Sequence, residues 1–391
     1  MIREKIEQAG TILKELDIDC WLIFLRETLV TPDPIQSYVV GADVTWESAF
    51  ILTASGQSIA IVGSLDAGEL QEQRNFGQII TYVEGIRQTL LETLLQINPN
   101  KIAVNYSESI PAADGLTHGM RLKLEEYLKE TDLAKRIVSA EPVITRLRGR
   151  KTVSEKQAMQ QAIAETLDIF AVAANAIQPG KTELDIAKIV QQEMDDAGLE
   201  PAWSRAMCPA VFTGPDTAIA HAAPTERIIE AGHIINMDFG VKINGYCADL
   251  QRSWYVRHAD EKTAPDAVQH GFDTLIAAIT LGAEHMRTGA IGKDIDTVVR
   301  EYLIANGYEG YPHGLGHQLG RVAHDGGALV APAWERYGNT PFIPLEAGQI
   351  FTIEPRLTVK GHGVVTIEEE VLITDSGAEF LSPRQHKIWL R

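Results

Sequence analysis

The chain has 391 residues, more than one hydrophobic core usually serves, so its length predicts two domains. Hydrophobic residues make up 45% of the chain and charged residues 23%, as is typical of a folded globular protein. The formal net charge of -18 argues against a nucleic-acid partner, because such partners are bound by clustered Lys and Arg.

The sequence shows no segment that predicts export or membrane insertion. Its first residues are charged and contain no apolar signal-peptide core, and no apolar run reaches about 18 residues. The cysteines, Cys20, Cys208 and Cys247, are far apart and form no CxxC pair. We therefore expect a cytoplasmic protein with reduced, buried cysteines and no membrane partner.

The first third of the chain reads as alternating short strands and helices. Apolar residues at helical spacing predict a helix over 2–16, and a continuous apolar run predicts a strand over 20–25. Strand-like runs on both sides of Ser55-Gly56 predict a hairpin. No nucleotide-binding glycine signature and no cluster of acids or histidines occurs here. We predict a support or specificity domain of α/β type over residues 1–148.

A second domain is predicted to begin at residue 149. Thr152 and Glu155 have capping-box spacing at the start of a long helical pattern. Strand patterns alternate with further helices, which are predicted over 182–198, 262–287 and 291–306. This order of elements predicts an α+β domain over residues 149–391.

A hairpin in this domain carries the first two candidate metal ligands. The Asn-Gly pair at 244–245 is the strongest short hairpin signal, and a two-residue turn there places Asp238 opposite Gln251. Asp249 then lies on the same face, at a diagonal Cα separation of roughly 7–8 Å from Asp238. Carboxylates so placed can share one cation or an adjacent pair, and without a cation they repel. The alternative for both is a solvated strand surface.

Three histidines, His313, His317 and His324, gather with three glycines in the segment 312–324. Glycine permits close approach of the backbone, and imidazole is both a common metal ligand and a common proton shuttle near neutral pH. A lone histidine is more often a hydrogen-bonded core residue, but three together favour a metal or catalytic site. The pattern does not choose which of the three binds metal.

Two apolar strands near the end of the chain carry the remaining candidate acids. Glu354 ends the first of them and is followed by a proline. A single strand over 364–373 holds three acids, with Glu368 and Glu370 on one face and Glu369 on the other. Acids in so apolar a strand are costly unless a cation offsets them. The alternative is a solvated edge strand, and the spacing does not choose between Glu368 and Glu370.

In chain order, these acids and histidines resemble the pita-bread metallopeptidases: prolidase, aminopeptidase P, methionine aminopeptidase and the metal-free creatinase. The resemblance covers about 151–391, and the preceding 150 residues are similar to the N-terminal domain of the creatinase and prolidase branch. It implies an α+β fold, with a C-terminal pita-bread domain preceded by a smaller α/β domain of creatinase type. It also implies two divalent metal ions, with manganese first and cobalt, zinc or iron as alternatives.

The resemblance gives each candidate residue a role. The implied metal ligands are Asp238, Asp249, His317, Glu354 and Glu368, of which Asp249 and Glu368 bridge both ions. The implied catalytic residues are His221, His324 and Glu354, with Glu354 also carrying a proton. The implied substrate-binding residues are His221, which lies in a Gly…His…Pro setting, His313 and His324.

The activity implied is cleavage of Xaa-Pro bonds in short proline-containing peptides through a metal-bridging hydroxide, as in aminopeptidase P or prolidase. A homodimer is also implied. One alternative keeps the fold and the metals but has a small non-peptide amide as substrate, and another is a catalytically silent protein that binds peptides. Thr366 stands where this branch usually has an arginine that supports a ligand aspartate, and this departure leaves the substrate open.

Overall fold

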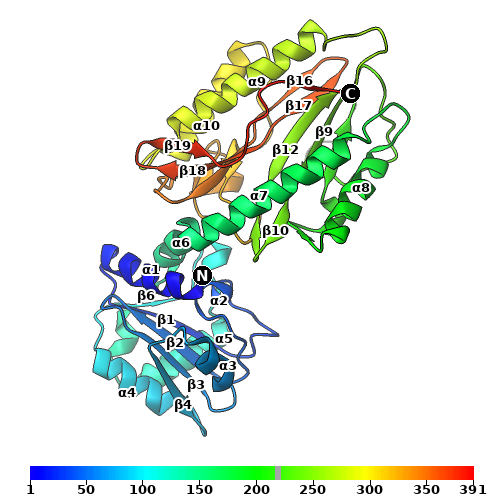
Figure 1. The fold of residues 1–391 in the computed structure, drawn as a ribbon. Coiled ribbons are helices and arrows are strands. Elements are labelled where there is room, and N and C mark those ends of the chain that lie inside the picture. Colours follow the sequence, from blue (N-terminus) through cyan, green and yellow to red (C-terminus); the bar gives the residue numbers. More distant parts are fainter. Residues whose placement is uncertain (216–221) are drawn as a thin grey trace. The chain divides into compact units, whose positions relative to one another are not determined.

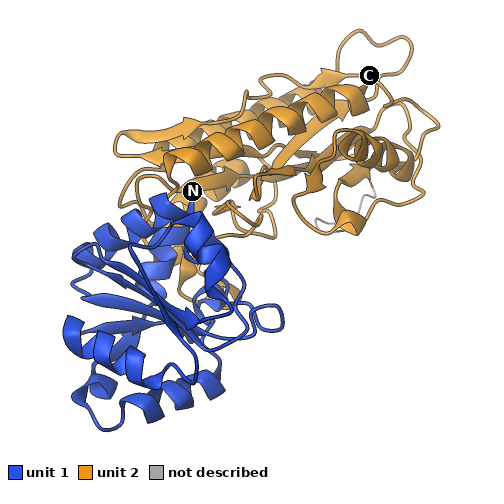
Figure 2. Cartoon of the chain, turned by 60° about the horizontal axis from the view of Figure 1, so that its bottom comes forward, with its two compact units in different colours: residues 1–148 blue, residues 149–391 orange. Residues whose placement is uncertain are grey.

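The computed structural model describes residues 1–215 and 222–391. The chain divides into two compact units, Met1–Arg148 and Gly149–Arg391, which Figure 2 colours blue and orange. None of the helices in the described ranges combines the length and apolar composition that a membrane span requires. His221, one of the candidate catalytic residues, lies outside the described residues.

The first unit is a six-stranded mixed sheet with helices around it (Figure 1). Its strands, in the order β4-β3-β2-β1-β5-β6, are β4 (Gln78–Tyr82), β3 (Ser58–Gly63), β2 (Ser48–Thr53), β1 (Cys20–Leu25), β5 (Ile102–Val104) and β6 (Ile137–Ser139). Its helices are α1 (Ile2–Glu15), α2 (Gln36–Val39), α3 (Ala67–Gln73), α4 (Arg87–Ile97), α5 (His118–Leu128) and α6 (Glu141–Gly149). The helix predicted over 2–16 and the hairpin around Ser55-Gly56 are confirmed.

Strand β1 is apolar along its whole length because both of its faces are buried. Trp21 and Ile23 belong to one core cluster of the unit, and Leu22 and Phe24 belong to another. A strand covered on both sides reads as a continuous apolar run rather than as an alternation.

The second unit contains four long helices and several small sheets. The helices are α7 (Val153–Ala174), α8 (Glu183–Asp196), α9 (Asp266–His285) and α10 (Gly292–Ala305). The strands are β7 (Glu200–Pro201), β8 (Ala210–Thr213), β9 (Ile234–Phe239), β10 (Val241–Ile243), β11 (Tyr246–Cys247), β12 (Leu250–Tyr255), β13 (Gly316–His317), β14 (Leu329–Val330), β15 (Ile350–Ile353), β16 (Arg356–Val359), β17 (Gly363–Thr366), β18 (Glu369–Thr374), β19 (Gly377–Phe380) and β20 (Trp389–Leu390). The α+β class predicted for this domain is confirmed.

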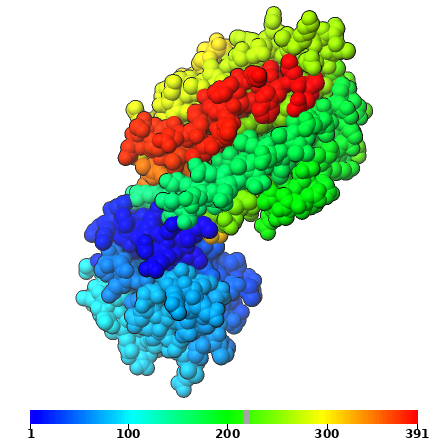
Figure 3. Space-filling view, in the orientation of Figure 1, coloured from blue at the N-terminus to red at the C-terminus, as the bar shows by residue number. Residues whose placement is uncertain are grey.

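The strands of this unit lie between two helix pairs (Figure 1). Helices α7 and α8 share one core cluster with β9 and β12, whereas α9 and α10 share another with β15 and β18. Threonines begin α7 and α8: Thr152 and Thr182 both form complete capping boxes, as predicted for Thr152. On the face seen in Figure 3, the C-terminal segment (red) lies along α7 (green), and β20 pairs with β12 in parallel.

The predicted register of the carboxylate hairpin is confirmed. Ile243 pairs with Tyr246 across a turn in which both Asn244 and Gly245 have positive φ, as a type I′ turn requires. The same register continues into the pair of β9 with β12, where Asp238 lies opposite Gln251.

The single strand predicted over 364–373 is wrong. The chain forms β17, which pairs with β16, and then β18, which pairs with β15 and β19 in another sheet. Between them, Glu368 makes an isolated bridge to Gln251 of β12. The sequence showed one apolar run because both strands are buried, and the change of pairing partners leaves no mark on such a run.

The three neighbouring acids of this segment face different environments. Glu369 accepts a hydrogen bond from the Arg252 guanidinium at 3.0 Å, and both side chains are fully buried. Glu370 accepts one from the backbone N–H of Asp249 at 2.9 Å. Arg252 also donates to the backbone oxygen of Glu368, so this buried cation ties β12 to the break between β17 and β18.

Candidate metal centre

Five side chains from five separate places in the second unit meet in one cavity of about 520 Å³. They come from β9, from the residue before β12, from β13, from the residue after β15 and from the break between β17 and β18, and they are Asp238, Asp249, His317, Glu354 and Glu368. These are the five positions that the family resemblance implied as metal ligands. The spacing alone left Glu368 and Glu370 open, and it is Glu368 that lines the cavity.

The distances are those of a loose cluster around one imidazole nitrogen. His317 Nε2 lies 3.4 Å from Glu354 Oε1, 3.8 Å from Asp249 Oδ2 and 3.9 Å from Glu368 Oε1. Asp249, His317 and Glu368 each offer a ligand atom within 4.8 Å of the others. A nitrogen and carboxylate oxygens converging in this way are the donor set of a hard to borderline divalent cation.

Backbone and side-chain hydrogen bonds fix the histidine side of the cluster. The N–H of His317 donates to Thr352 Oγ1 at 3.1 Å, and the N–H of Glu354 donates to Leu315 O at 2.8 Å. The other ring nitrogen of His317, Nδ1, lies 3.3 Å from Gln318 O. A proton on Nδ1 satisfies that carbonyl and leaves the lone pair of Nε2 directed at the carboxylates, which is the tautomer a metal ligand needs.

Burial makes the ionised form of these acids costly. It raises the pKa of Asp238 to about 7 and raises the pKa of Asp249, Glu354 and Glu368 well above the ordinary range, with the neighbouring carboxylates adding to the effect on the last three. Asp238 Oδ1 and Glu368 Oε1 are buried oxygens that accept no hydrogen bond from any described residue. The cavity lining within the described ranges contains no lysine or arginine. Divalent cations would satisfy both the unmatched charge and the free oxygens, so these residues fit metal ions.

Two further histidines line the cavity. The ring of His324 stands edge-on to that of His317, with ring centroids 4.3 Å apart. His313 lies at the same cavity, and its Nδ1 is 2.7 Å from Gly314 O. The structure thus brings His313, His317 and His324 together, as their clustering in the sequence suggested.

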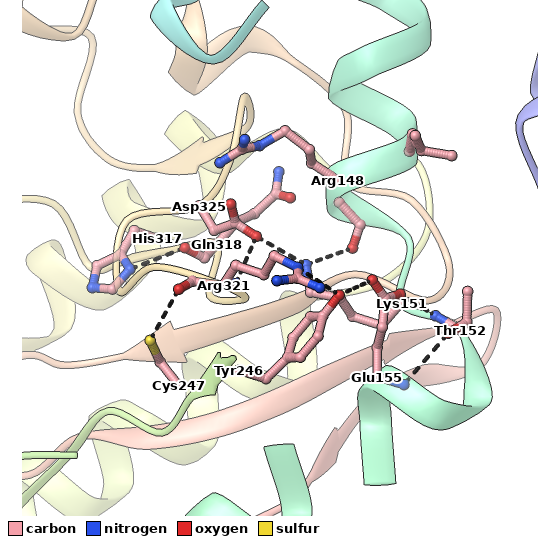
Figure 4. A network of polar contacts seen from close by, with 12 residues as sticks. Arg148, Lys151, Thr152, Glu155, Tyr246, Cys247, His317, Gln318, Arg321 and Asp325 are labelled. Atoms are coloured by element: carbon pink, nitrogen blue, oxygen red, sulfur yellow. Dashed lines mark hydrogen bonds and ion pairs between the residues drawn. The ribbon is translucent and has the colours of Figure 1, made fainter. Parts of the chain in front are cut away.

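A buried polar network supports the histidine loop, residues 312–324, on the side away from the cavity (Figure 4). Asp325, next to His324, is fully buried and pairs with the ammonium of Lys151 at 3.8 Å. The Asp325 carboxylate accepts from the N–H of Arg321 at 3.2 Å, and its own N–H donates to Gln318 O at 2.9 Å. The pairing of Lys151 with Asp325 was not predicted from the sequence, because nothing in the spacing of two distant residues marks them as partners.

We predict that the metal-free protein loses stability as the pH rises from about 4 to about 7. Below about pH 4 the site carboxyls are protonated in both the folded and the unfolded chain. Above it the unfolded chain ionises first, because the folded-state pKa of Asp238 is raised to about 7 and its neighbours are raised as well. Thermal melting in the presence of a chelator, between pH 4 and pH 8, measures this loss.

Asp238→Asn is the control for that experiment, because it removes one of the buried ionisable groups and retains its shape. The melting temperature of this variant should fall less than that of the wild type over the same pH range. Parallel melting curves for the two proteins would show that the site carboxyls are not the cause.

The chain is similar to known metallopeptidases. Residues 157–375 match metallopeptidase family M24. The Xaa-Pro dipeptidase of Pyrococcus furiosus is 27% identical over 276 residues, covering 70% of this chain and 74% of the relative. The uncharacterized peptidase YqhT of Bacillus subtilis is 24% identical over 375 residues, covering 95% of this chain and 96% of the relative.

Solved structures match along the whole chain. An Xaa-Pro dipeptidase from Bacillus anthracis has a TM-score of 0.71 and 21% identity, with 100% of both chains covered. An X-Pro aminopeptidase from Thermotoga maritima has a TM-score of 0.70 and 21% identity, with 99% of both chains covered. These likenesses confirm the expected pita-bread fold. With the family match spanning more than half of its length, the chain belongs to metallopeptidase family M24.

Proposed function

We propose that this metallopeptidase is a dinuclear hydrolase that cleaves Xaa-Pro bonds in short peptides, in the manner of an aminopeptidase P or a prolidase. The observation that carries the proposal is the convergence of four carboxylates and one imidazole in a single cavity, with buried carboxylate oxygens left free. The Xaa-Pro specificity is supported by the Xaa-Pro dipeptidase relative and by the two similar structures.

Different residues of the cluster are proposed to hold each of the two ions. Asp238 would hold one ion, His317 and Glu354 would hold the other, and Asp249 and Glu368 would contact both. Asp249 and Glu368 each have an oxygen within 4 Å of His317 Nε2, which puts both within reach of the ion proposed beside His317. In this arrangement four negative charges face two doubly charged cations. The free-energy cost of ionising the buried carboxylates is therefore offset when metal binds.

When bound, a pair of divalent ions activates a water molecule and polarises the scissile carbonyl. The chain's own groups then move the proton and orient the peptide. Glu354, partly exposed to the cavity, accepts a proton at a carboxylate oxygen and passes it to the leaving nitrogen. His324 and His313 contact the substrate from the cavity wall, and His221 is proposed to hydrogen-bond it as well.

The rest of the cavity suits the apolar part of a short peptide. Trp203, Met207, Ala210 and Leu329 line it, and a proline ring can pack against such surfaces.

We further propose manganese as the metal, a homodimer as the working assembly and a cytoplasmic location. All three cysteines are buried and unpaired, which supports a reducing compartment.

Purified protein that has been stripped with a chelator and reloaded with Mn²⁺ should cleave Ala-Pro or Ala-Pro-Ala. It should not cleave Ala-Ala or Ala-Ala-Ala, which match the proline peptides in length. Asp249→Ala and Glu368→Ala should abolish turnover, because each removes a bridging ligand. Glu379→Ala, which removes an exposed acid on β19, is the control and should retain full activity. Wild-type turnover in either bridging variant would contradict the ligand assignment, and cleavage of none of the peptides would contradict the substrate.

Replacing His324 or His221 with alanine should lower kcat by about 100-fold or more, because a positioned proton-transfer or hydrogen-bonding group contributes 10²–10⁴-fold. The number of metal ions per chain, measured by elemental analysis, should stay unchanged. His285→Ala, in the last turn of α9, is the matched control. Loss of metal from the His324 variant would instead make this residue a ligand.

A further inference from the structure

Gln251 occupies an unusual place beside the metal centre. It lies opposite Asp238 in the β9–β12 pair and is only 8% exposed, at the wall of the same cavity. Its side-chain nitrogen Nε2 donates a hydrogen bond to Asp238 Oδ2 at 3.0 Å. One oxygen of this proposed ligand is therefore held by a neutral donor. The other, Oδ1, is buried and accepts no hydrogen bond from the described residues.

Thr366 fixes the orientation of the Gln251 amide. An ionised carboxylate can only accept hydrogen bonds, so the NH₂ group of Gln251 must face Asp238 and the amide oxygen must face away. The Thr366 hydroxyl donates to that oxygen. The backbone of Thr366 is itself held at both ends by Ser253, whose hydroxyl donates to Thr366 O at 2.7 Å and accepts from Thr366 N at 3.3 Å.

The main chain of Gln251 also holds a second proposed ligand. Its carbonyl accepts from the N–H of Glu368 at 3.2 Å and from Arg252 Nη1 at 2.8 Å. Gln251 therefore contacts the side chain of Asp238 and the backbone of Glu368 at the same time. One residue thus joins two proposed ligands, one on β9 and one at the break between β17 and β18.

We propose that Gln251 is a positioning residue, itself held by Thr366, that orients the Asp238 carboxylate so that Oδ1 is left for a metal ion. This inference rests on the proposed role of Asp238 as a ligand. Because the amide is neutral, it orders the carboxylate without neutralising its charge, whereas a cationic partner would compete with the metal for that charge. The hydrogen bonds from Thr366 to Gln251 and from Gln251 to Asp238 thus support this carboxylate in place of a charged side chain.

The test is metal affinity, measured without any substrate. Mn²⁺ titrated calorimetrically into the metal-free wild type should bind in two steps. Gln251→Ala should weaken one step by roughly 10–100-fold, the usual effect of losing a group that orients a ligand, and leave the other nearly unchanged. Thr366→Val removes the hydroxyl at nearly constant volume and should weaken the same step by a smaller factor.

The double variant Gln251→Ala/Thr366→Val separates a relay from two independent effects. It should bind Mn²⁺ no more weakly than Gln251→Ala alone, because Thr366 acts only through the amide. Thr166→Val removes another buried hydroxyl, one that accepts from Val241 N outside the cavity, and should bind as the wild type does. If Gln251→Ala does not fold, Thr366→Val alone decides the question.

The metal site and the positioning role of Gln251 can be overturned separately. Wild-type Mn²⁺ affinity in both Gln251→Ala and Thr366→Val would overturn the positioning role and leave the metal site intact. A wild type that binds no Mn²⁺ would overturn the metal site and this inference together. Additive losses in the double variant would overturn the relay through Thr366.

Discussion

The mutual repulsion of buried carboxylates is the constraint on which the second unit depends. Asp238, Asp249, Glu354 and Glu368 share one cavity, and their burial disfavours the ionised forms. Such a cluster is costly as a purely structural feature, since apolar residues would fill the same space more stably. The proposed binding of cations explains its presence, and the fold of the unit brings the carboxylates together against their repulsion.

The fold separates the acid proposed to bind metal, Glu368, from the neighbouring acids that support the structure. Glu369 is matched by the buried Arg252, and Glu370 accepts from the backbone of Asp249, so both are engaged by the fold. Glu368 and Glu370 each keep one buried oxygen that accepts no hydrogen bond from the described residues, but of the two only Glu368 lines the cavity. The break between β17 and β18 produces this difference, because it turns Glu368 out of either sheet and toward β12. The presence of Glu368 in the proposed ligand set is therefore a consequence of where the strands change partners.

Local signals in the sequence predicted much of this arrangement. The Asn244-Gly245 turn set the register of a hairpin, and the register placed Asp238 opposite Gln251. Capping-box spacing located the start of α7, and clustering pointed to the histidine loop. Each of these signals lies within a few residues of the feature it specifies.

Features that depend on distant partners could not be predicted in this way. The break between β17 and β18 is invisible because buried strands of different sheets have the same apolar composition. The pairing of Lys151 with Asp325 joins the beginning of the unit to the histidine loop, and no periodicity connects them. The register did place Gln251 opposite Asp238, but its bond to Thr366 needs the packing of two sheets. The choice of Glu368 over Glu370 required the resemblance to a family.

The central claim is that the five residues hold two ions side by side. Anomalous diffraction from crystals of the protein grown with Mn²⁺, collected above the manganese absorption edge, tests it most directly. We predict two anomalous peaks in the cavity, one beside Asp238 and one beside His317 and Glu354, with Asp249 and Glu368 touching both. A single peak, or peaks away from these side chains, would contradict the account.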